Sequence, residues 1–301
     1  MDFDLNDHQR RRLEAVGSLI DDSDAAADAD AEELDKALLA SDFHHGASVL
    51  ERFLIAEQLA RRGVGGGYGL YCLLSDLLPT DLPAGLVAIT EADRSGPVRF
   101  ADTAAVVVQL HAKQATIHAP RRDEVLPANT TFGYPYAHVS LAGQSCALPD
   151  GAGVALRARW RLALVAEISG NSRSAISRTA EHLRSRKQFG QPLASFQALR
   201  HRLADAAVSA EATTWMGREA AFNHDPRGIL RAAWYASNTA AKLVPELVQM
   251  CGARAFAIEF GLHTYTMRMN CLRLELGGID RLGQELAAND TIHRIGAGVA
   301  R

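Results

Sequence analysis

The pattern of hydrophobic and polar residues changes character twice along this 301-residue chain. Over residues 1–83, apolar residues such as Val16 and Ile20 recur at the spacing of one helix face. Residues 84–153 hold short β-branched runs between clusters of Gly, Pro, Asp and Asn, which is typical of strands. Helical periodicity returns over residues 154–301. This order predicts a mainly α protein with an N-terminal helical domain, a small central β domain and a C-terminal antiparallel four-helix bundle.

Glycine and proline breaks divide the last region into long helices. We expect them over residues 154–186, 196–222, 229–250 and 256–276, with a final helix that ends near residue 299. An acidic, alanine-rich stretch over residues 21–30 is expected to be a linker or the start of a helix. The glycine-rich run GVGGGYG over residues 63–69 neither follows a clear strand nor precedes a βαβ unit. We interpret this run as a loop and not as a dinucleotide-binding motif.

Composition and charge exclude several classes of protein. The chain has 32 Lys+Arg against 35 Asp+Glu, a net charge of −3, whereas a dedicated nucleic-acid binder carries a basic excess. No apolar run reaches the ~20 residues of a membrane helix, and the start MDFDLNDHQRRRLEAVG shows no signal peptide. We therefore expect a cytoplasmic protein that binds neither nucleic acid nor membrane. We expect no metal, because the histidines and cysteines form no cluster with metal-ligand spacing.

One segment of the last region carries most of the functional information. Residues 184–211 read RSRKQFGQPLASFQALRHRLADAAVSAE, and this segment resembles the acyl-CoA dehydrogenase motif R-x-x-F-G-x-P-[IL]-x-x-F-Q-x-x-x-x-x-L-A-D. Two weaker matches flank it, AITEADRSG over residues 88–96 and QMCGA over residues 249–253. The order of the domains agrees with that family as well. The resemblance implies an FAD-dependent dehydrogenase that introduces an α,β double bond into an acyl-CoA thioester.

The resemblance also implies which residues contact the cofactor, at a site shared with the neighbouring subunit of a dimer. The candidates at and beside the matched motifs are Arg186, Gln188, Phe189, Gln197, Gln249 and Gly252. A guanidinium binds a pyrophosphate through bidentate, charge-assisted hydrogen bonds, and an aromatic ring covers the face of another ring. Amides read adenine or ribose edges, and glycine permits close approach of the backbone. The alternative interpretation is an exposed arginine, an aromatic core residue and surface amides without a ligand.

The catalytic base is not evident from the sequence. A carboxylate must take the α-proton of the thioester while hydride leaves the β-carbon for the flavin. Counting along the family's motifs puts Leu276 or Gly277 at the usual base position and Trp160 at the alternative one. Glu275 is adjacent and is the runner-up, although both it and Glu167 are typical of solvated acids on helices. The catalytic residue therefore stays unknown at this point.

The chain is shorter than members of the family, and the loss falls mainly in the β domain. All three tryptophans follow residue 150, so the family segment that lays a tryptophan against the isoalloxazine ring has no counterpart. We therefore predict a small subunit of a heteromeric, α2β2 acyl-CoA dehydrogenase of the actinobacterial steroid-catabolism type. A second acyl-CoA dehydrogenase-like subunit would supply the base. The alternatives are a self-sufficient homo-oligomer that uses Glu275, and a non-catalytic assembly subunit.

Overall fold

The computed structural model describes the backbone of residues 5–22 and 31–299, and the side chains of these residues up to residue 288. The N-terminal region forms helices α1 (Asp7–Asp22), α2 (Ala31–Ala40), α3 (Val49–Arg61) and α4 (Tyr68–Leu74), followed by the 3-10 turn η1 (Ser75–Leu77). The helix face predicted around Val16 and Ile20 is confirmed, because both side chains are buried on α1. Most of the acidic stretch that we predicted as a linker lies outside the described residues.

Residues 63–67 of the glycine-rich run form a loop, as predicted, and its last two residues, Tyr68 and Gly69, begin α4. Asp35 of α2 caps this helix, since its carboxylate accepts the backbone N–H of Gly67 at 2.8 Å and of Tyr68 at 3.1 Å. A side chain at Gly66 would collide with this carboxylate, because a Cβ there would lie 2.4 Å from both of its oxygens. Burial raises the pKa of the Asp35 carboxyl to about 6. The glycines of this run therefore serve a buried cap between two helices.

The central region folds as two small sheets. Strands β1 (Leu86–Glu91), β3 (Ala104–Leu110), β4 (Ala115–His118) and β7 (Ser145–Ala147) form the first sheet in that order. β1 and β3 run parallel, and the other pairs are antiparallel. Strands β2 (Val98–Arg99), β6 (Tyr136–Val139) and β5 (Val125–Ala128) form the second, antiparallel sheet, and the 3-10 turn η2 (Arg122–Glu124) precedes β5. The β-branched runs of the sequence are therefore strands, as predicted.

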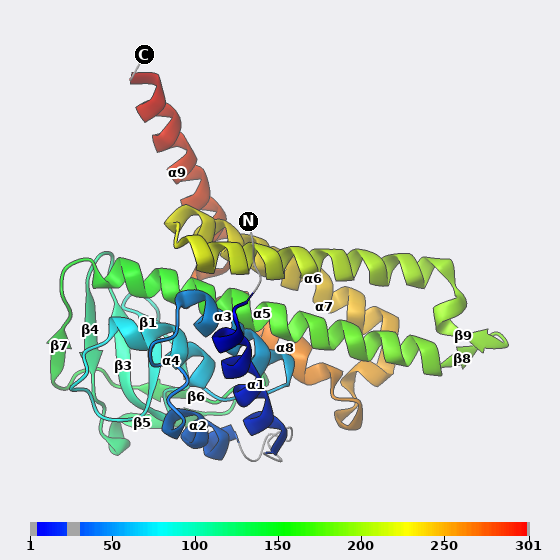
Figure 1. Cartoon of the computed structure of the whole chain (residues 1–301), viewed down its shortest axis with the longest axis horizontal. Helices are drawn as coiled ribbons and strands as arrows, with labels where there is room; N and C mark the ends of the chain where they lie inside the picture. The colour runs from blue at the N-terminus through cyan, green and yellow to red at the C-terminus, as the bar shows by residue number, and fades with distance from the viewer. Residues whose placement is uncertain (1–4, 23–30, 300–301) are drawn as a thin grey trace.

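Helix α5 (Ala152–Ser185) runs along the molecule from the sheets to the opposite end of the bundle (Figure 1). It packs against α3, α8 (Leu262–Leu272), α6 (Gln197–Asn223) and α7 (Pro226–Cys251). The hairpin of β8 (Lys187–Gln188) and β9 (Gln191–Pro192), with the 3-10 turn η3 (Leu193–Ser195), joins α5 to α6. The last turns of α5 and α7 and the first turn of α6 meet beside this hairpin (Figure 1). We call this region the hairpin end of the bundle.

The helix predicted over residues 256–276 is shorter than expected. The 3-10 turns η4 (Gly252–Phe256) and η5 (Ile258–Phe260) come first, and α8 begins only after Gly261, whose φ of 67° lies in the left-handed region. After η6 (Glu275–Gly277), the final helix α9 (Gly278–Val299) extends away from the bundle in its last turns (Figure 1). Within the described residues, no helix is long and apolar enough to cross a membrane.

Candidate functional site

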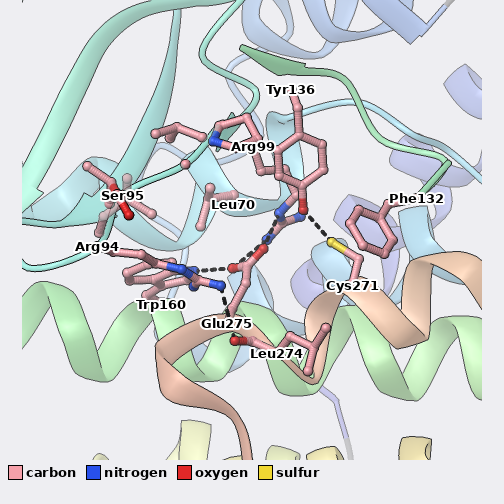
Figure 2. A pocket seen from close by; sticks show the side chains of 15 residues that line it. Leu70, Arg94, Ser95, Arg99, Phe132, Tyr136, Trp160, Cys271, Leu274 and Glu275 are labelled. Carbon is pink, nitrogen blue, oxygen red and sulfur yellow. Dashed lines mark hydrogen bonds and ion pairs between the residues drawn. The ribbon is translucent and has the colours of Figure 1, made fainter. Parts of the chain in front are cut away.

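A cavity of about 180 Å³ lies where the β domain meets the bundle. Its walls come from the loop after β1, from α4 and α5, and from the segment between α8 and η6 (Figure 2). Arg94, Ser95 and Gly96 at the rim belong to the segment that resembles the family's strand–loop motif. The cavity is smaller than the roughly 300–1,000 Å³ of typical small-molecule sites.

Glu275 points into this cavity and both of its carboxylate oxygens are occupied (Figure 2). Arg99 donates from Nε to Oε1 at 2.7 Å, and the indole Nε1–H of Trp160 donates to Oε2 at 2.7 Å. Only 7% of Glu275 is exposed to solvent. The expectation that Glu275 is a solvated helix acid is therefore wrong. Trp160 stands at the family's alternative base position, and Glu275 stands next to the usual one. The two side chains are in contact.

The backbone after α8 explains how Glu275 reaches the cavity. Leu276 has a φ of 54°, and Gly277 and Gly278 follow with φ values of 81° and 71°. These three successive residues with positive φ interrupt the helical backbone between η6 and α9. In a regular helix, the side chains of Glu275 and Leu276 would point about 100° apart. In this turn both side chains are buried.

Arg99 is the centre of the buried charges. Besides its bond to Glu275, it donates from Nη1 to Glu167 Oε2 at 2.6 Å, and the Tyr134 hydroxyl donates to the same oxygen at 2.8 Å. Glu167 is buried as well, so the expectation that it lies on a wet helix face is wrong. Burial alone would lower the pKa of Arg99, but the two carboxylates outweigh it and raise this pKa well above its usual range. Arg99 is therefore a permanent cation fixed between two glutamates.

This arrangement limits what Glu275 can do chemically. A general base must accept the proton that it removes, and here both oxygens of Glu275 already accept hydrogen bonds, from Arg99 and Trp160. The surrounding Cys271 thiol, next to the Tyr136 hydroxyl, has a pKa raised to about 12 by burial and by Glu275. It is thus neutral near pH 7 and is no nucleophile there. Arg99 and Glu275, two of the charged groups that line the cavity, are therefore paired with each other.

The six predicted cofactor residues lie together at the hairpin end. Arg186 is the C-cap of α5, Gln188 and Phe189 belong to the hairpin, and Gln197 begins α6. The remaining two are Gln249 in the last turn of α7 and Gly252 just after it. All six are exposed. The structure therefore brings together the residues that the motif singled out, and it places Glu275 elsewhere.

Phe189 is the most exposed of the large apolar side chains, at 90%. Its backbone has a φ of 54° at the tip of the hairpin, and its only ring contact among the described residues is with Phe196, at 6.1 Å between centroids. The alternative interpretation of Phe189 as a core residue is therefore wrong. An aromatic ring held out on a strained turn suits contact with another molecule.

Sequence reasoning missed Arg99, which lies in a two-residue strand outside any motif. The sole signal was a charged residue inside the apolar run PVRFA. Trp160 and Arg186 both belong to α5 or its cap, and at 1.5 Å per residue about 40 Å of helix separates the cavity from the hairpin end. The cavity and the hairpin end are therefore two separate regions of the molecule.

Comparison with known proteins agrees with this architecture. Residues 155–288 match the family model described as acyl-CoA dehydrogenase, C-terminal domain. This part of the chain is therefore similar to the C-terminal domain of acyl-CoA dehydrogenases. Acyl-CoA dehydrogenase IpdE2 of Mycobacterium tuberculosis is 34% identical over 105 residues, which are 35% of this chain and 33% of that protein. The matches to IpdE2 and to the other curated relatives span less than half of each relative's length.

Solved structures share the fold over nearly the whole chain. The ChsE4–ChsE5 complex from Mycobacterium tuberculosis aligns with a TM-score of 0.71 at 16% identity, covering 100% of this chain and 99% of that one. The FAD complex of PigA aligns with a TM-score of 0.74 at 18% identity, covering 97% of this chain and 100% of that one. These likenesses establish the acyl-CoA dehydrogenase fold, with its helical domain, β domain and helical bundle.

Proposed function

We propose that this chain is the small subunit of a heteromeric, FAD-dependent acyl-CoA dehydrogenase. In this assembly its hairpin end contacts the pyrophosphate and adenosine of FAD bound mainly by a partner subunit. The observation that carries the proposal is the gathering of the six exposed candidate residues at one end of the bundle, about 40 Å of helix away from the cavity beside the β domain. These residues fit the cofactor: an exposed guanidinium, an exposed ring and an open glycine backbone.

The chain's own cavity supports the heteromeric form of this proposal. FAD, when bound, supplies the hydride acceptor for the β-carbon of the thioester, and the reaction also needs a free carboxylate for the α-proton. Here the cavity is small, and both oxygens of Glu275 are held by Arg99 and Trp160. The partner subunit would therefore supply both the base and the ring-binding wall.

The nature of the partner follows from the same reasoning. A second acyl-CoA dehydrogenase-like chain would carry the ring-binding wall and a base, which gives an α2β2 assembly as the expected form. The similarity to the ChsE4–ChsE5 complex, a complex of two chains by its name, supports this arrangement. The substrate would be a steroid-derived acyl-CoA, in line with the resemblance of the sequence to subunits of that type. A cytoplasmic location stays a prediction.

Arg186 provides the test. Removing a guanidinium that is paired with a partly desolvated charge costs about 2–5 kcal/mol, which is roughly a 30- to several-thousand-fold loss of affinity. Arg186→Ala should therefore give a complex that assembles but is depleted in FAD, and added FAD should partly restore activity. Arg184→Ala is the matched control, since Arg184 is also an exposed arginine at this helix end and the motif does not mark it. Flavin absorbance per complex after gel filtration is the measurement.

Two results would change this proposal. If both variants retain full flavin, Arg186 does not contact the cofactor and the motif serves packing of the bundle. If the chain expressed alone yields a yellow homo-oligomer with dehydrogenase activity, the self-sufficient alternative with Glu275 as base replaces the heteromer. The proposal expects the lone chain to be free of flavin.

A further inference from the structure

A further cavity, of about 550 Å³, lies where α1 and α3 meet α5 and α6. Its volume is within the roughly 300–1,000 Å³ of typical small-molecule sites, whereas the cavity beside the β domain is smaller. Arg173 of α5 lines this further cavity and stands midway in sequence between Trp160 and Arg186. About 20 Å of helix therefore separates it from the cavity beside the β domain and from the hairpin end.

Four arginines from three helices line this cavity, and we call it the arginine pocket. Arg61 is the last residue of α3 and Arg62 is its C-cap, while Arg173 lies on α5 and Arg218 on α6. Glu57 is the one acid among the described residues that line the pocket. Both of its carboxylate oxygens already accept hydrogen bonds, one of them from Arg218 at 2.8 Å. The wall of the pocket therefore has an excess of positive charge.

Three of these guanidinium groups are free or only weakly paired. Arg62 pairs with Asp21 at 3.2 Å, and the Asp21 side chain is 65% exposed. Arg173 pairs with Glu211 at 3.2 Å, and the Glu211 side chain is 49% exposed. Arg61 is exposed and forms no ion pair with any residue that the structure describes. Because ion pairs this exposed contribute little to stability, an anionic ligand can replace either carboxylate at little cost.

The rest of the pocket wall is largely apolar. Leu5, Leu13 and Leu54 line it from the residues before α1, from α1 and from α3. None of the described lining residues is aromatic, so the pocket lacks the stacking surface that a nucleobase needs. Basic groups beside leucine side chains suit a small amphiphile, with a negative head for the guanidinium groups and an apolar chain for the leucines.

We propose that the arginine pocket binds a small phosphate monoester with a short apolar chain. A phosphate monoester has three terminal oxygens and nearly two negative charges, so it can accept hydrogen bonds from Arg61 and Arg173 together. A carboxylate offers two oxygens and one charge. Guanidinium groups hold phosphate through bidentate, charge-assisted hydrogen bonds. This site is independent of the proposed cofactor contact, because the arginine pocket and the hairpin end share no lining residue.

Calorimetric titration of the full chain with hexyl phosphate tests the proposal. We expect saturable binding with a Kd below about 1 mM, weaker binding of inorganic phosphate and of hexanoate, and no binding of hexanol. Arg61→Ala and Arg173→Ala should each weaken the binding of hexyl phosphate roughly 10-fold or more, because hydrogen bonds between charged groups are lost. Arg61→Lys should weaken it less, since the charge is kept. Arg184→Ala and Arg186→Ala, outside the pocket, should leave it unchanged.

The controls separate the pocket from the rest of the surface. The proposal is wrong if the wild type shows no saturable binding, if hexanol binds as tightly as hexyl phosphate, or if Arg61→Ala and Arg173→Ala keep wild-type affinity. A loss of binding in Arg186→Ala alone would place the ligand at the hairpin end and would also overturn it. A loss in a pocket variant counts only if that variant melts at the wild-type temperature. If one of the two alanine variants does not fold, the other decides, and if neither folds, wild-type affinity of Arg61→Lys overturns the proposal.

Discussion

Arginine has opposite environments in two regions of the molecule, the cavity beside the β domain and the hairpin end of the bundle. Beside the β domain, Arg99 is fully enclosed, lies over the rings of Phe100 and Tyr134, and is bonded to two buried glutamates. At the hairpin end, Arg186 is exposed and has no acidic partner among the described residues. A buried cation needs acidic partners in its own chain because its desolvation is costly. An exposed cation is solvated by water and stays free to pair with a ligand. This difference is the basis of our proposal that the first region stabilises the fold and the second binds an anion.

The same contrast applies to the aromatic residues of the two regions. Trp160 is buried, and its indole N–H donates a hydrogen bond to Glu275. Phe189 is exposed on the tip of a hairpin. An apolar ring that contributes nothing to the core of its own chain suits a contact with another molecule. The following predictions test whether this division into a structural and a binding region is correct.

The largest effect is expected for Arg99→Met. The change leaves Glu167 and Glu275 buried without their counter-ion, and breaking a buried pair in this way typically costs about 3–5 kcal/mol. Urea unfolding of the full chain, followed by tryptophan fluorescence, should show this loss in the free energy of unfolding. The double variant Arg99→Met with Glu275→Gln should recover part of it. A loss below about 1 kcal/mol, as for an exposed pair, would contradict the structural role of this cluster.

Phe189→Ala tests the other region. The free energy of unfolding should change by less than about 0.5 kcal/mol, as for other exposed sites. Affinity of the complex for FAD should fall, because stacking of an aromatic side chain on a base is worth about 1–3 kcal/mol, or roughly 5- to 150-fold. Titration of the flavin-free complex measures the second effect. A variant that is destabilised but binds FAD normally would reverse our assignment of this residue.

Asp35 is a buried acid whose hydrogen-bond partners are backbone N–H groups, whereas Arg99 is paired with carboxylates. Burial raises the pKa of its carboxyl from 3.8 to about 6 in the folded chain. Its contribution to stability is therefore fully present below about pH 3.8 and is lost as the pH rises through 6. From pH 7 to pH 5 the wild type should gain about 1 kcal/mol relative to Asp35→Asn. Urea unfolding of both proteins at the two pH values measures this difference, and a gain for Asp35→Asn instead would show that the carboxylate is not buried.

The bundle and its hairpin end could be predicted from the sequence because their signals are local. Helical periodicity and the spacing of Arg186, Phe189 and the following residues lie within one short segment. The cavity could not be predicted in the same way. Arg99 and Glu275 are 176 residues apart in sequence, and no local pattern indicates which distant charge a glutamate will meet. Glu275 also depends on the left-handed turn at Leu276, a conformation that a leucine rarely adopts.

The predicted helix over residues 256–276 failed for a related reason. Its hydrophobic pattern continues through Gly261, but the left-handed conformation of this glycine interrupts the helix. The two 3-10 turns before it bring Arg254 and Phe260 onto α5. The contacts that distinguish the hairpin end from an ordinary bundle end are therefore tertiary, and periodicity alone does not reveal them.

Glu275→Gln in the reconstituted complex tests the central claim most directly. Glu275 forms an ion pair with Arg99, and we propose that the partner subunit supplies the base. Activity per bound flavin should then stay within about threefold of the wild type, since no general base is lost. Expressing activity per flavin removes the effect of any complex lost through weaker folding. A fall of about two to four orders of magnitude with flavin still bound would contradict the account and make Glu275 the catalytic base.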